Sequence, residues 1–215
     1  MTAIPRQAPV KFAAVAAETE NRDGWPVVLK YQEEGPGPWL VDLSHKTRWD
    51  LQDGHITRFR PRDIDIPPNP GGCAFKNGVL VNRLNRTQAA VWHLGPETPA
   101  SPQDPAFTDV TEATAFLALF GPRVFYLTEK LTSLDFLAPD KRPPFLYQGP
   151  FSHVPGQVVT LEKDGGAGGG LLWTCSRGYG QAMVRAVLDA GKEFGLRPAG
   201  EKTFWEWLAR LQSRP

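Results

Sequence analysis

The chain has 215 residues, 41% of them hydrophobic, and a formal net charge of +1. This length predicts one large domain or two small ones with a buried core. The near-neutral charge excludes a strong electrostatic field that would attract nucleic acid or an acidic membrane. No apolar run reaches the ~20 residues that span a bilayer. Residues 1–20 lack the apolar segment of a signal peptide. Cys73 and Cys175 form neither a CxxC motif nor a disulfide framework, so we expect a reducing cytoplasm.

Residues 42–54 and 109–121 carry two copies of one pattern. Each copy starts with Asp, an aliphatic residue and a hydroxyl residue, continues with an extended segment, and ends at Gly. The short polar side chains favour a turn, because their oxygens accept nearby backbone N–H groups. A hairpin is predicted after each copy, pairing 78–84 with 89–94 and 156–162 with 171–176. The pattern therefore predicts an internal duplication.

Asp42, Ser44 and His45 resemble the elements of a hydrolytic triad, but the duplication argues against that interpretation. The second copy has Thr111 in place of Ser44 and Glu112 in place of His45. Adjacent residues on a strand also point to opposite faces. The two copies share turn chemistry, so we interpret the motif as structural and predict no catalytic residue here.

Three helices are predicted in the second half. Gly121-Pro122 opens one that extends to about residue 134, since Pro is favoured at a first helical position. A second covers 179–194 and ends at Gly195, and a third covers 200–212. The corresponding part of the first half, residues 55–72, is rich in Pro and charge and is predicted to be a loop.

Three blocks of the sequence resemble the glycine-cleavage T-protein (aminomethyltransferase) superfamily. They are "DLSHKTRWDL", "DVTEATAFLALFGPRVFYLTEKLTSLDF" and "CSRGYGQAMVRAVLDAGKEFGLRPAGE", and together they cover roughly residues 25–205. The resemblance implies an α+β, folate-binding T-protein-like fold with two pseudo-repeated antiparallel sheet and helix halves around a central channel. The C-terminal barrel domain of full T-proteins is expected to be absent. The small γ subunit of heterotetrameric sarcosine oxidase is similar in size.

The resemblance also implies a domain organisation. We expect an N-terminal extension over residues 1–24 and a single T-protein-like domain over 25–212. Its first half would cover about 25–100 and its second half about 105–212.

The family's folate-site carboxylates are not matched in this chain. The Asp pair of the family falls on Asn77 and Gly78, ahead of Asn82 and Arg83. An amide can form hydrogen bonds but carries no charge and cannot accept a proton. The run that matches the second acidic hairpin, residues 167–173, contains no acid. Losing several charge-assisted hydrogen bonds would weaken folate binding by orders of magnitude.

Other candidate sites have plain structural explanations. The glycine-rich run 165–170 lacks a phosphate-loop pattern, so we predict a flexible hairpin tip. The turn from Arg177 to Tyr179 fits either an anion site or a tight strand-to-helix connection. Trp205 lies off the apolar stripe of its helix, where it is either packed or exposed for docking. The histidines lack paired ligand spacing and are predicted to be exposed or lightly buried, without a metal; they are His45, His55, His93 and His153.

Two functions follow from the resemblance. In the first, the chain is a non-catalytic subunit in one-carbon or methylamine metabolism that packs against a larger flavin- or folate-dependent partner. In the second, it binds tetrahydrofolate and assists one-carbon transfer. The predicted ligand-binding residues are then Asn77, Asn82 and Arg83 within the pocket, and Arg177 and Tyr179 near its mouth. Neither a nucleic acid nor a membrane is an expected partner.

Overall fold

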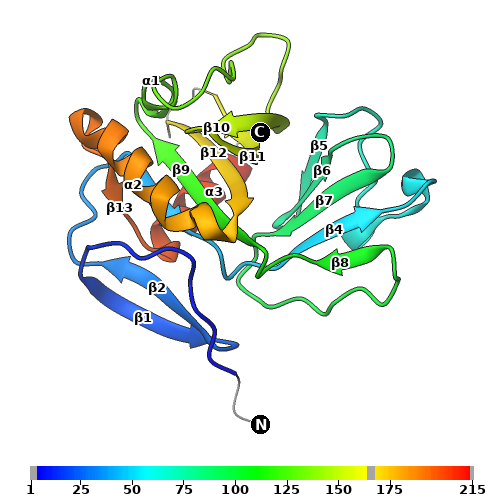
Figure 1. Cartoon of the computed structure of the whole chain (residues 1–215), viewed down its shortest axis with the longest axis horizontal. Helices are drawn as coiled ribbons and strands as arrows, with labels where there is room; N and C mark the ends of the chain where they lie inside the picture. The colour runs from blue at the N-terminus through cyan, green and yellow to red at the C-terminus, as the bar shows by residue number, and fades with distance from the viewer. Residues whose placement is uncertain (1–3, 164–167, 214–215) are drawn as a thin grey trace.

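The computed structural model describes residues 4–163 and 168–213, which form two large sheets, a two-stranded hairpin and three α-helices (Figure 1). The strands are β1 (Ala16–Arg22), β2 (Trp25–Tyr31), β3 (Trp39–Asp42), β4 (Arg48–Gln52), β5 (Cys73–Lys76), β6 (Val79–Arg83), β7 (Gln88–His93), β8 (Phe107–Asp109), β9 (Thr114–Gly121), β10 (Phe145–Phe151), β11 (Val154–Glu162), β12 (Gly169–Ser176) and β13 (Arg197–Pro198). The α-helices are α1 (Val124–Thr128), α2 (Gly180–Gly191) and α3 (Glu201–Gln212), and the short 3-10 helices are η1 (Ile56–Arg58), η2 (Pro61–Asp63), η3 (Arg177–Tyr179) and η4 (Lys192–Phe194).

The two large sheets repeat one strand order. The five-stranded sheet runs β5-β6-β7-β4-β8, and the six-stranded sheet runs β10-β11-β12-β9-β3-β13. The predicted hairpins are therefore present as β6–β7 and β11–β12. The short entry strands are exchanged: β3 leads into β4 but pairs with β9, whereas β8 leads into β9 but pairs with β4. Each sheet thus contains one strand from the opposite copy.

The turns at which the copies cross have the predicted chemistry. The Asp42 carboxylate accepts the N–H of Ser44 at 2.9 Å, and the Asp109 carboxylate accepts the N–H of Thr111 at 2.8 Å. The Ser44 hydroxyl accepts a backbone N–H from β9 at 3.1 Å, and the Thr111 hydroxyl accepts one from β4 at 3.0 Å. The repeated Asp–aliphatic–hydroxyl pattern therefore fixes both turns and attaches each to the other copy.

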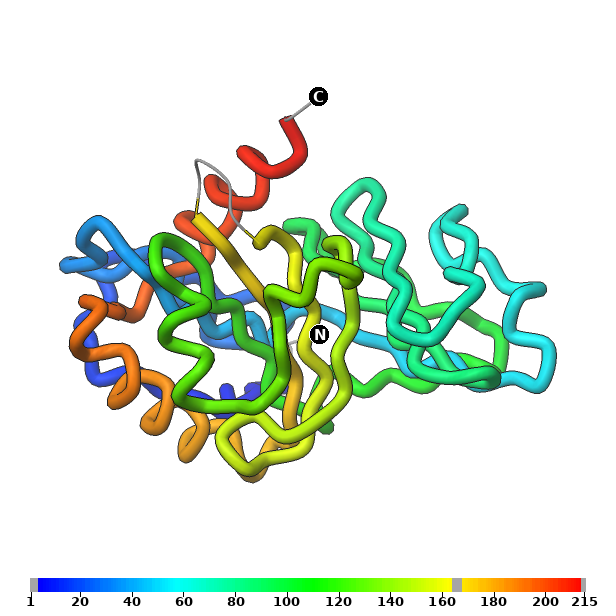
Figure 2. Tube along the Cα trace, turned by 90° about the horizontal axis from the view of Figure 1, so that it is seen from above, coloured from blue at the N-terminus to red at the C-terminus, as the bar shows by residue number. Residues whose placement is uncertain are grey.

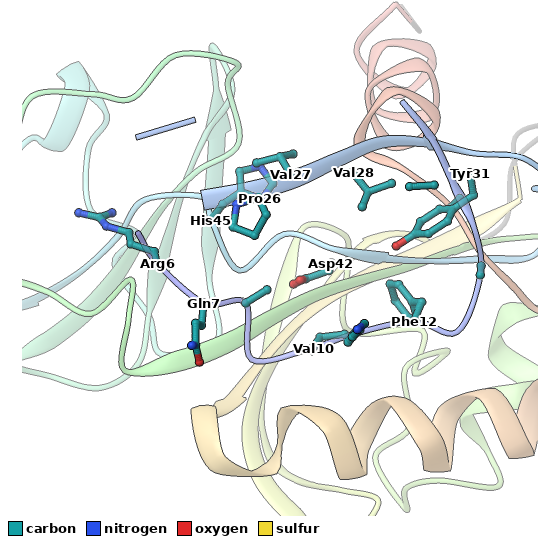
Figure 3. A pocket seen from close by; sticks show the side chains of 15 residues that line it. Arg6, Gln7, Val10, Phe12, Pro26, Val27, Val28, Tyr31, Asp42 and His45 are labelled. Atoms are coloured by element: carbon teal, nitrogen blue, oxygen red, sulfur yellow. The ribbon is translucent and has the colours of Figure 1, made fainter. Parts of the chain in front are cut away.

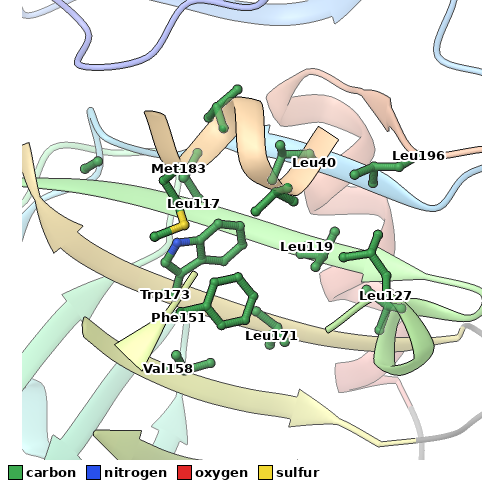
Figure 4. Packing of buried hydrophobic residues seen from close by; sticks show 14 of the residues in the cluster. Leu40, Leu117, Leu119, Leu127, Phe151, Val158, Leu171, Trp173, Met183 and Leu196 are labelled. Atoms are coloured by element: carbon green, nitrogen blue, oxygen red, sulfur yellow. The ribbon is translucent and has the colours of Figure 1, made fainter. Parts of the chain in front are cut away.

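Strand β9 is apolar along its whole length because both of its faces are buried. Leu117 and Leu119 pack with α2 residues such as Met183 on one face, and Trp173 of β12 joins this cluster (Figure 4). Phe120 belongs to the opposite face, where side chains of α3 and of the five-stranded sheet pack together. The alternation follows from the two-residue period of a strand. The six-stranded sheet is consequently the central layer of the molecule.

The expected loop over 55–72 contains the two short 3-10 helices η1 and η2. It covers the outer face of the five-stranded sheet through Ile56, Ile64 and Ile66, which are all buried. In Figure 2 this segment lies at the far side of the five-stranded sheet from α2. Three isoleucines placed among Pro and charged residues are enough to close that face.

The helix predicted from residue 122 to about 134 is wrong in length and in its start. The observed helix α1 covers only Val124–Thr128, because Arg123 adopts a left-handed conformation with a φ of 61°. A hydrogen bond within the helix marks its C-terminal end: the Thr128 hydroxyl donates to the carbonyl of Phe125 at 2.9 Å. Leu131 and Leu134 still pack against the core, but from an irregular segment. Their apolar spacing was therefore mistaken for helical periodicity.

The other two helices agree with the sequence analysis. The predicted helix 179–194 is present as η3, α2 and η4, and Gly195 follows with a φ of 76°, as expected of a left-handed cap. Helix α3 buries Phe204, Trp207 and Leu208 as predicted. None of the helices in residues 4–163 and 168–213 is long and apolar enough to cross a bilayer.

Replacing Gly195 with Ala is expected to lower the free energy of unfolding by about 1 kcal/mol, since an L-residue is strained at positive φ. No atom of the described residues lies within 4 Å of the added Cβ, so the expected effect is conformational. Gly178→Ala is the matched control, because that site is equally open and has no positive φ. Urea denaturation measures both. Equal effects at the two sites would contradict the role of the cap.

The boundary expected at residue 24 falls in the turn between β1 and β2, which pair over their length. Residues before β1 pack on the same face of the six-stranded sheet as α2, because Val10 and Phe12 belong to the cluster that contains Leu117. The limits predicted for the extension and the two halves remain predictions.

Candidate functional site

A buried guanidinium lies where the two turns cross. Arg48 is 0% exposed, and its side chain donates to five backbone carbonyls, at Leu43, Ser44, Lys46, Thr111 and Thr114. Three of these carbonyls belong to the first turn and two to the second. Burial lowers the pKa of Arg48 to about 9, and the charges of Asp42 and Asp109 oppose that shift. Arg48 therefore stays protonated at neutral pH and joins the two copies.

A second group of charges surrounds Glu201, the first residue of α3, which is 0% exposed. One oxygen, Glu201 Oε1, contacts Arg22 Nη1 at 2.9 Å, His45 Nε2 at 2.9 Å, and Lys46 Nζ. Lys46 Nζ also donates to the carbonyl of Gly95 at 2.7 Å. We call Arg22, His45, Lys46 and Glu201 the Glu201 cluster. It ties β1, the first crossing turn and α3 together.

The Glu201 cluster holds its carboxylate ionised. Burial opposes ionisation, but hydrogen bonds from His45 and Arg22 and the charge of Lys46 outweigh it and lower the pKa of Glu201 to about 2. Burial lowers the pKa of His45, so its imidazole is neutral at neutral pH and donates through Nε2–H. Burial also lowers the pKa of Lys46. Lys46 and Arg22, which also pairs with Glu20, thus supply the positive charge around one buried carboxylate.

Trp205 is partly buried above the Glu201 cluster. Lys46 Nζ lies 4.8 Å from the centre of its ring, and the Arg22 guanidinium lies 5.7 Å away. These are cation–π distances, and they favour the packed alternative over a freely exposed docking residue. The spacing of the apolar stripe could not reveal this contact, because both cations lie far from Trp205 in sequence.

A cavity of about 500 Å³ lies between the N-terminal segment, β2 and the end of β3 (Figure 3). Most of its walls are apolar and come from residues such as Val10, Phe12 and Val28. Asp42 and the Tyr31 hydroxyl point into it, as Figure 3 shows. Burial raises the pKa of Asp42, and burial together with the charge of Asp42 raises the pKa of Tyr31. The phenol is therefore a neutral hydrogen-bond donor.

A second cavity of about 600 Å³ lies on the other side of the crossing turn and is lined by Asp109, Thr111 and Thr47. His45 lines both cavities. The two aspartates that the duplication equates therefore lie on different cavities. The sequence predicts only a turn role for Asp42, whereas in the structure its carboxylate also faces an apolar space.

The predicted ligand residues of the first half do not share one pocket. Asn77 is exposed in the turn between β5 and β6, with a φ of 49°, and lines two clefts beside α3. Asn82 is 0% exposed on the face of β6 that also carries Leu80, and neither its Oδ1 nor its Nδ2 has a hydrogen-bond partner among the residues that the structure describes. Arg83 is buried toward the opposite face, with Nε and Nη1 unpartnered.

Arg177 and Tyr179 lie at the start of α2, away from the clefts that Asn77 lines. Arg177 contacts the backbone carbonyls of Glu112 and Gln7, and its guanidinium lies 5.9 Å from the Trp25 ring centre. Tyr179 is 53% exposed. The tight-turn alternative accounts for these contacts, and a ligand role for either residue remains a prediction.

One histidine differs from its predicted position: His93, on β7, is buried, and its Nε2 lies 3.1 Å from Glu97. His45 is half-buried, within the prediction, and contacts Glu201. His55 and His153 are exposed as predicted. The hydroxyl of Ser44 contacts β9 rather than His45, so the structural interpretation of that motif agrees with the geometry. Within residues 4–163 and 168–213, no group of three or more His, Cys, Asp or Glu side chains could hold a metal ion.

The glycine-rich run lies only partly within the described structure. Residues 164–167 fall outside it, so the predicted hairpin tip is not described there. Gly169 and Gly170 begin β12 and are buried. A Cβ on Gly170 would lie 2.2 Å from Trp207, so close packing against α3 requires this glycine.

Comparison with known proteins agrees with this architecture. The chain is 30% identical over 152 residues to an aminomethyltransferase of Saccharopolyspora erythraea. The aligned residues make up 70% of this chain and 35% of that protein. A chain of heterotetrameric sarcosine oxidase from Corynebacterium sp. U-96 superposes with a TM-score of 0.63 at 18% identity, covering 88% of this chain and 96% of that one. The resemblance to the T-protein superfamily is confirmed. No family model matches the chain.

The T-protein-like fold is also shared with glycine cleavage system aminomethyltransferase T from Bartonella henselae. That superposition has a TM-score of 0.57 at 13% identity and covers 87% of this chain and 57% of that one. The chain spans about a third of the length of its curated relative, 35%, and nearly the whole of the sarcosine oxidase chain, 96%. His45, Lys46 and Glu201 all lie in the blocks that carried the resemblance, but no pattern within those blocks pairs them.

Proposed function

We propose that the chain is a non-catalytic subunit of a T-protein-like assembly in one-carbon or methylamine metabolism. It would pack against a larger flavin- or folate-dependent chain. The observation that carries this proposal is the position of Asn77 and Gly78. These residues replace the family's Asp pair and form a hairpin turn whose φ values are 49° and 72°.

The surroundings of Asn77 support the same conclusion. The larger cleft that it lines, about 590 Å³, has no carboxylate among its lining residues. The smaller one, about 270 Å³, contains Glu97, which is bound to His93. Neither cleft offers a free acid to bind a pterin ring or to accept a proton. Size adds support, because a chain of a heterotetrameric enzyme has nearly the same extent.

The proposal places the protein in a reducing cytoplasm. Cys73 and Cys175 are both free thiols. Burial raises the pKa of Cys73 to about 12 and that of Cys175 to about 11, which makes both unreactive.

An alternative function is tetrahydrofolate binding. The unpartnered amide of Asn82 favours it, since a buried polar group without a hydrogen bond is uncommon and a ligand could satisfy it. Asn77, Arg83, Arg177 and Tyr179 would then complete the contacts.

Two measurements separate the functions. Titration with tetrahydrofolate, followed by tryptophan fluorescence or calorimetry, is expected to show no saturable binding up to millimolar concentrations. Purification of the tagged chain from its native host is expected to recover a larger flavin- or folate-dependent chain in fixed stoichiometry. Micromolar folate binding that Asn82→Ala weakens would overturn the subunit proposal.

A further inference from the structure

The cavity that Asp42 lines combines apolar walls with two polar groups. Its walls are mainly apolar, and a carboxylate and a phenol point into the space between them (Figure 3). A carboxylate facing an apolar cavity is costly unless a cation or several hydrogen-bond donors accompany it. Its turn function requires one oxygen to accept the N–H of Ser44, and an amide would serve equally well.

Asp42 lacks a contacting cation within the described residues. No Lys, Arg or His nitrogen in 4–163 and 168–213 lies within 4.0 Å of its carboxylate. Arg48 acts on it only through space, because the donors of Arg48 are directed to carbonyls and to the Thr114 hydroxyl. The nearby imidazole of His45 is committed to Glu201.

We propose that this cavity binds a small protonated monoamine with an apolar body. The ammonium group would contact the Asp42 carboxylate and the Tyr31 hydroxyl oxygen, and the apolar body would pack against Val10, Phe12 and Val28. Charge-assisted hydrogen bonds of this kind are about twice as strong as neutral ones. The cavity volume, about 500 Å³, lies within the usual range for small-molecule sites.

The rim of the cavity restricts the ligand class further. Arg6 and Lys11 are also among its lining residues, and Arg6 is paired with Glu112 at 3.2 Å. A second positive charge on the ligand would be repelled by these cations, so a diamine should bind less well than a monoamine. This inference is independent of the subunit role, because it concerns a different cavity from those beside Asn77.

Calorimetric titration with three compounds that share a phenylethyl body and differ in charge tests the proposal on the unmodified protein. The probes are 2-phenylethylamine, the neutral 2-phenylethanol and the anionic 3-phenylpropanoate. The amine is expected to bind saturably at one site with millimolar affinity or better. The alcohol should bind at least about tenfold more weakly, and the anion not at all.

Variants then assign the binding to the carboxylate. Asp42→Asn keeps an oxygen for the N–H of Ser44 but removes the charge, so amine affinity should fall about tenfold or more while alcohol affinity stays unchanged. Asp109→Asn is the matched control: it makes the same change in the equivalent turn but lines the other cavity. Its amine affinity should match that of the unmodified chain.

Three outcomes would overturn the proposal. They are absence of saturable amine binding, equal affinity for the amine and the alcohol, and unchanged amine affinity in a folded Asp42→Asn variant. The first two require no variant, so the test does not depend on whether Asp42→Asn folds. None of these outcomes bears on the folate titration or on co-purification with a partner chain.

Discussion

Glu201→Gln is expected to lower the free energy of unfolding by about 3–5 kcal/mol, the usual effect of removing one partner from a buried ion pair. The substitution preserves shape but removes the carboxylate that contacts Lys46 and leaves Arg22 paired with Glu20 alone. The side chain of Lys46 is only 3% exposed, so water cannot replace the carboxylate. Urea denaturation followed by tryptophan fluorescence measures the change. Glu206→Gln, on the exposed side of the same helix, is the control and should change stability by less than about 0.5 kcal/mol.

The pH dependence of this effect has a defined sign. The pKa of Glu201 is lowered on folding from 4.5 to about 2, so its ionised form stabilises the folded chain above 4.5. That stabilisation is lost as pH falls from 4.5 toward 2. The stability difference between the unmodified chain and Glu201→Gln should therefore shrink as pH falls below about 4.5, where Glu201 of the unfolded chain becomes protonated. A difference that stays constant down to pH 3 would contradict the assignment.

Arg48→Met should be at least as damaging, at about 4 kcal/mol or more, because it removes hydrogen bonds from several buried groups at once. Five backbone carbonyls would each lose a donor, and the buried positive charge that interacts with Asp42 and Asp109 would be removed. Chemical denaturation again gives the value. Arg48→Lys should recover only part of the loss, since an ammonium group cannot reach both turns.

The control for Arg48 is Arg185→Met, at an exposed position on α2. It makes the same chemical change without touching a turn and should leave stability within about 0.5 kcal/mol. If Arg48→Met were as mild as this control, the crossing of the two copies would not depend on the guanidinium. The Lys variant keeps the comparison informative should the Met variant fail to fold.

The local patterns of the sequence were sufficient to predict much of this fold. Two copies of Asp–aliphatic–hydroxyl predicted the two turns, because a short acidic side chain bonds to backbone two residues ahead wherever the chain can turn. Gly195 marked the end of α2 for a similarly local reason. The same approach failed for residues 122–134, where apolar spacing resembled a helix but a left-handed Arg123 and core packing gave an irregular segment.

The candidate sites required contacts between distant parts of the chain. Glu201 and Lys46 are separated by more than half of the sequence, and their pairing follows from the position of α3 against the first crossing turn. Asp42 is identifiable in sequence as a turn residue, but the apolar space in front of it is made by the N-terminal segment and β2. Neither arrangement has a local signature.

By itself, the sequence determined the repeated turns, the hairpins and two of the three helices. These features depend on backbone preferences and side-chain chemistry within a few residues. Only the tertiary structure decided the exchange of β3 and β8 between sheets, the burial of Arg48 and Glu201, and the placing of Asp42 on a cavity. Those depend on which surfaces meet, and the free energy of burying a charge is set by groups that the chain brings together only on folding.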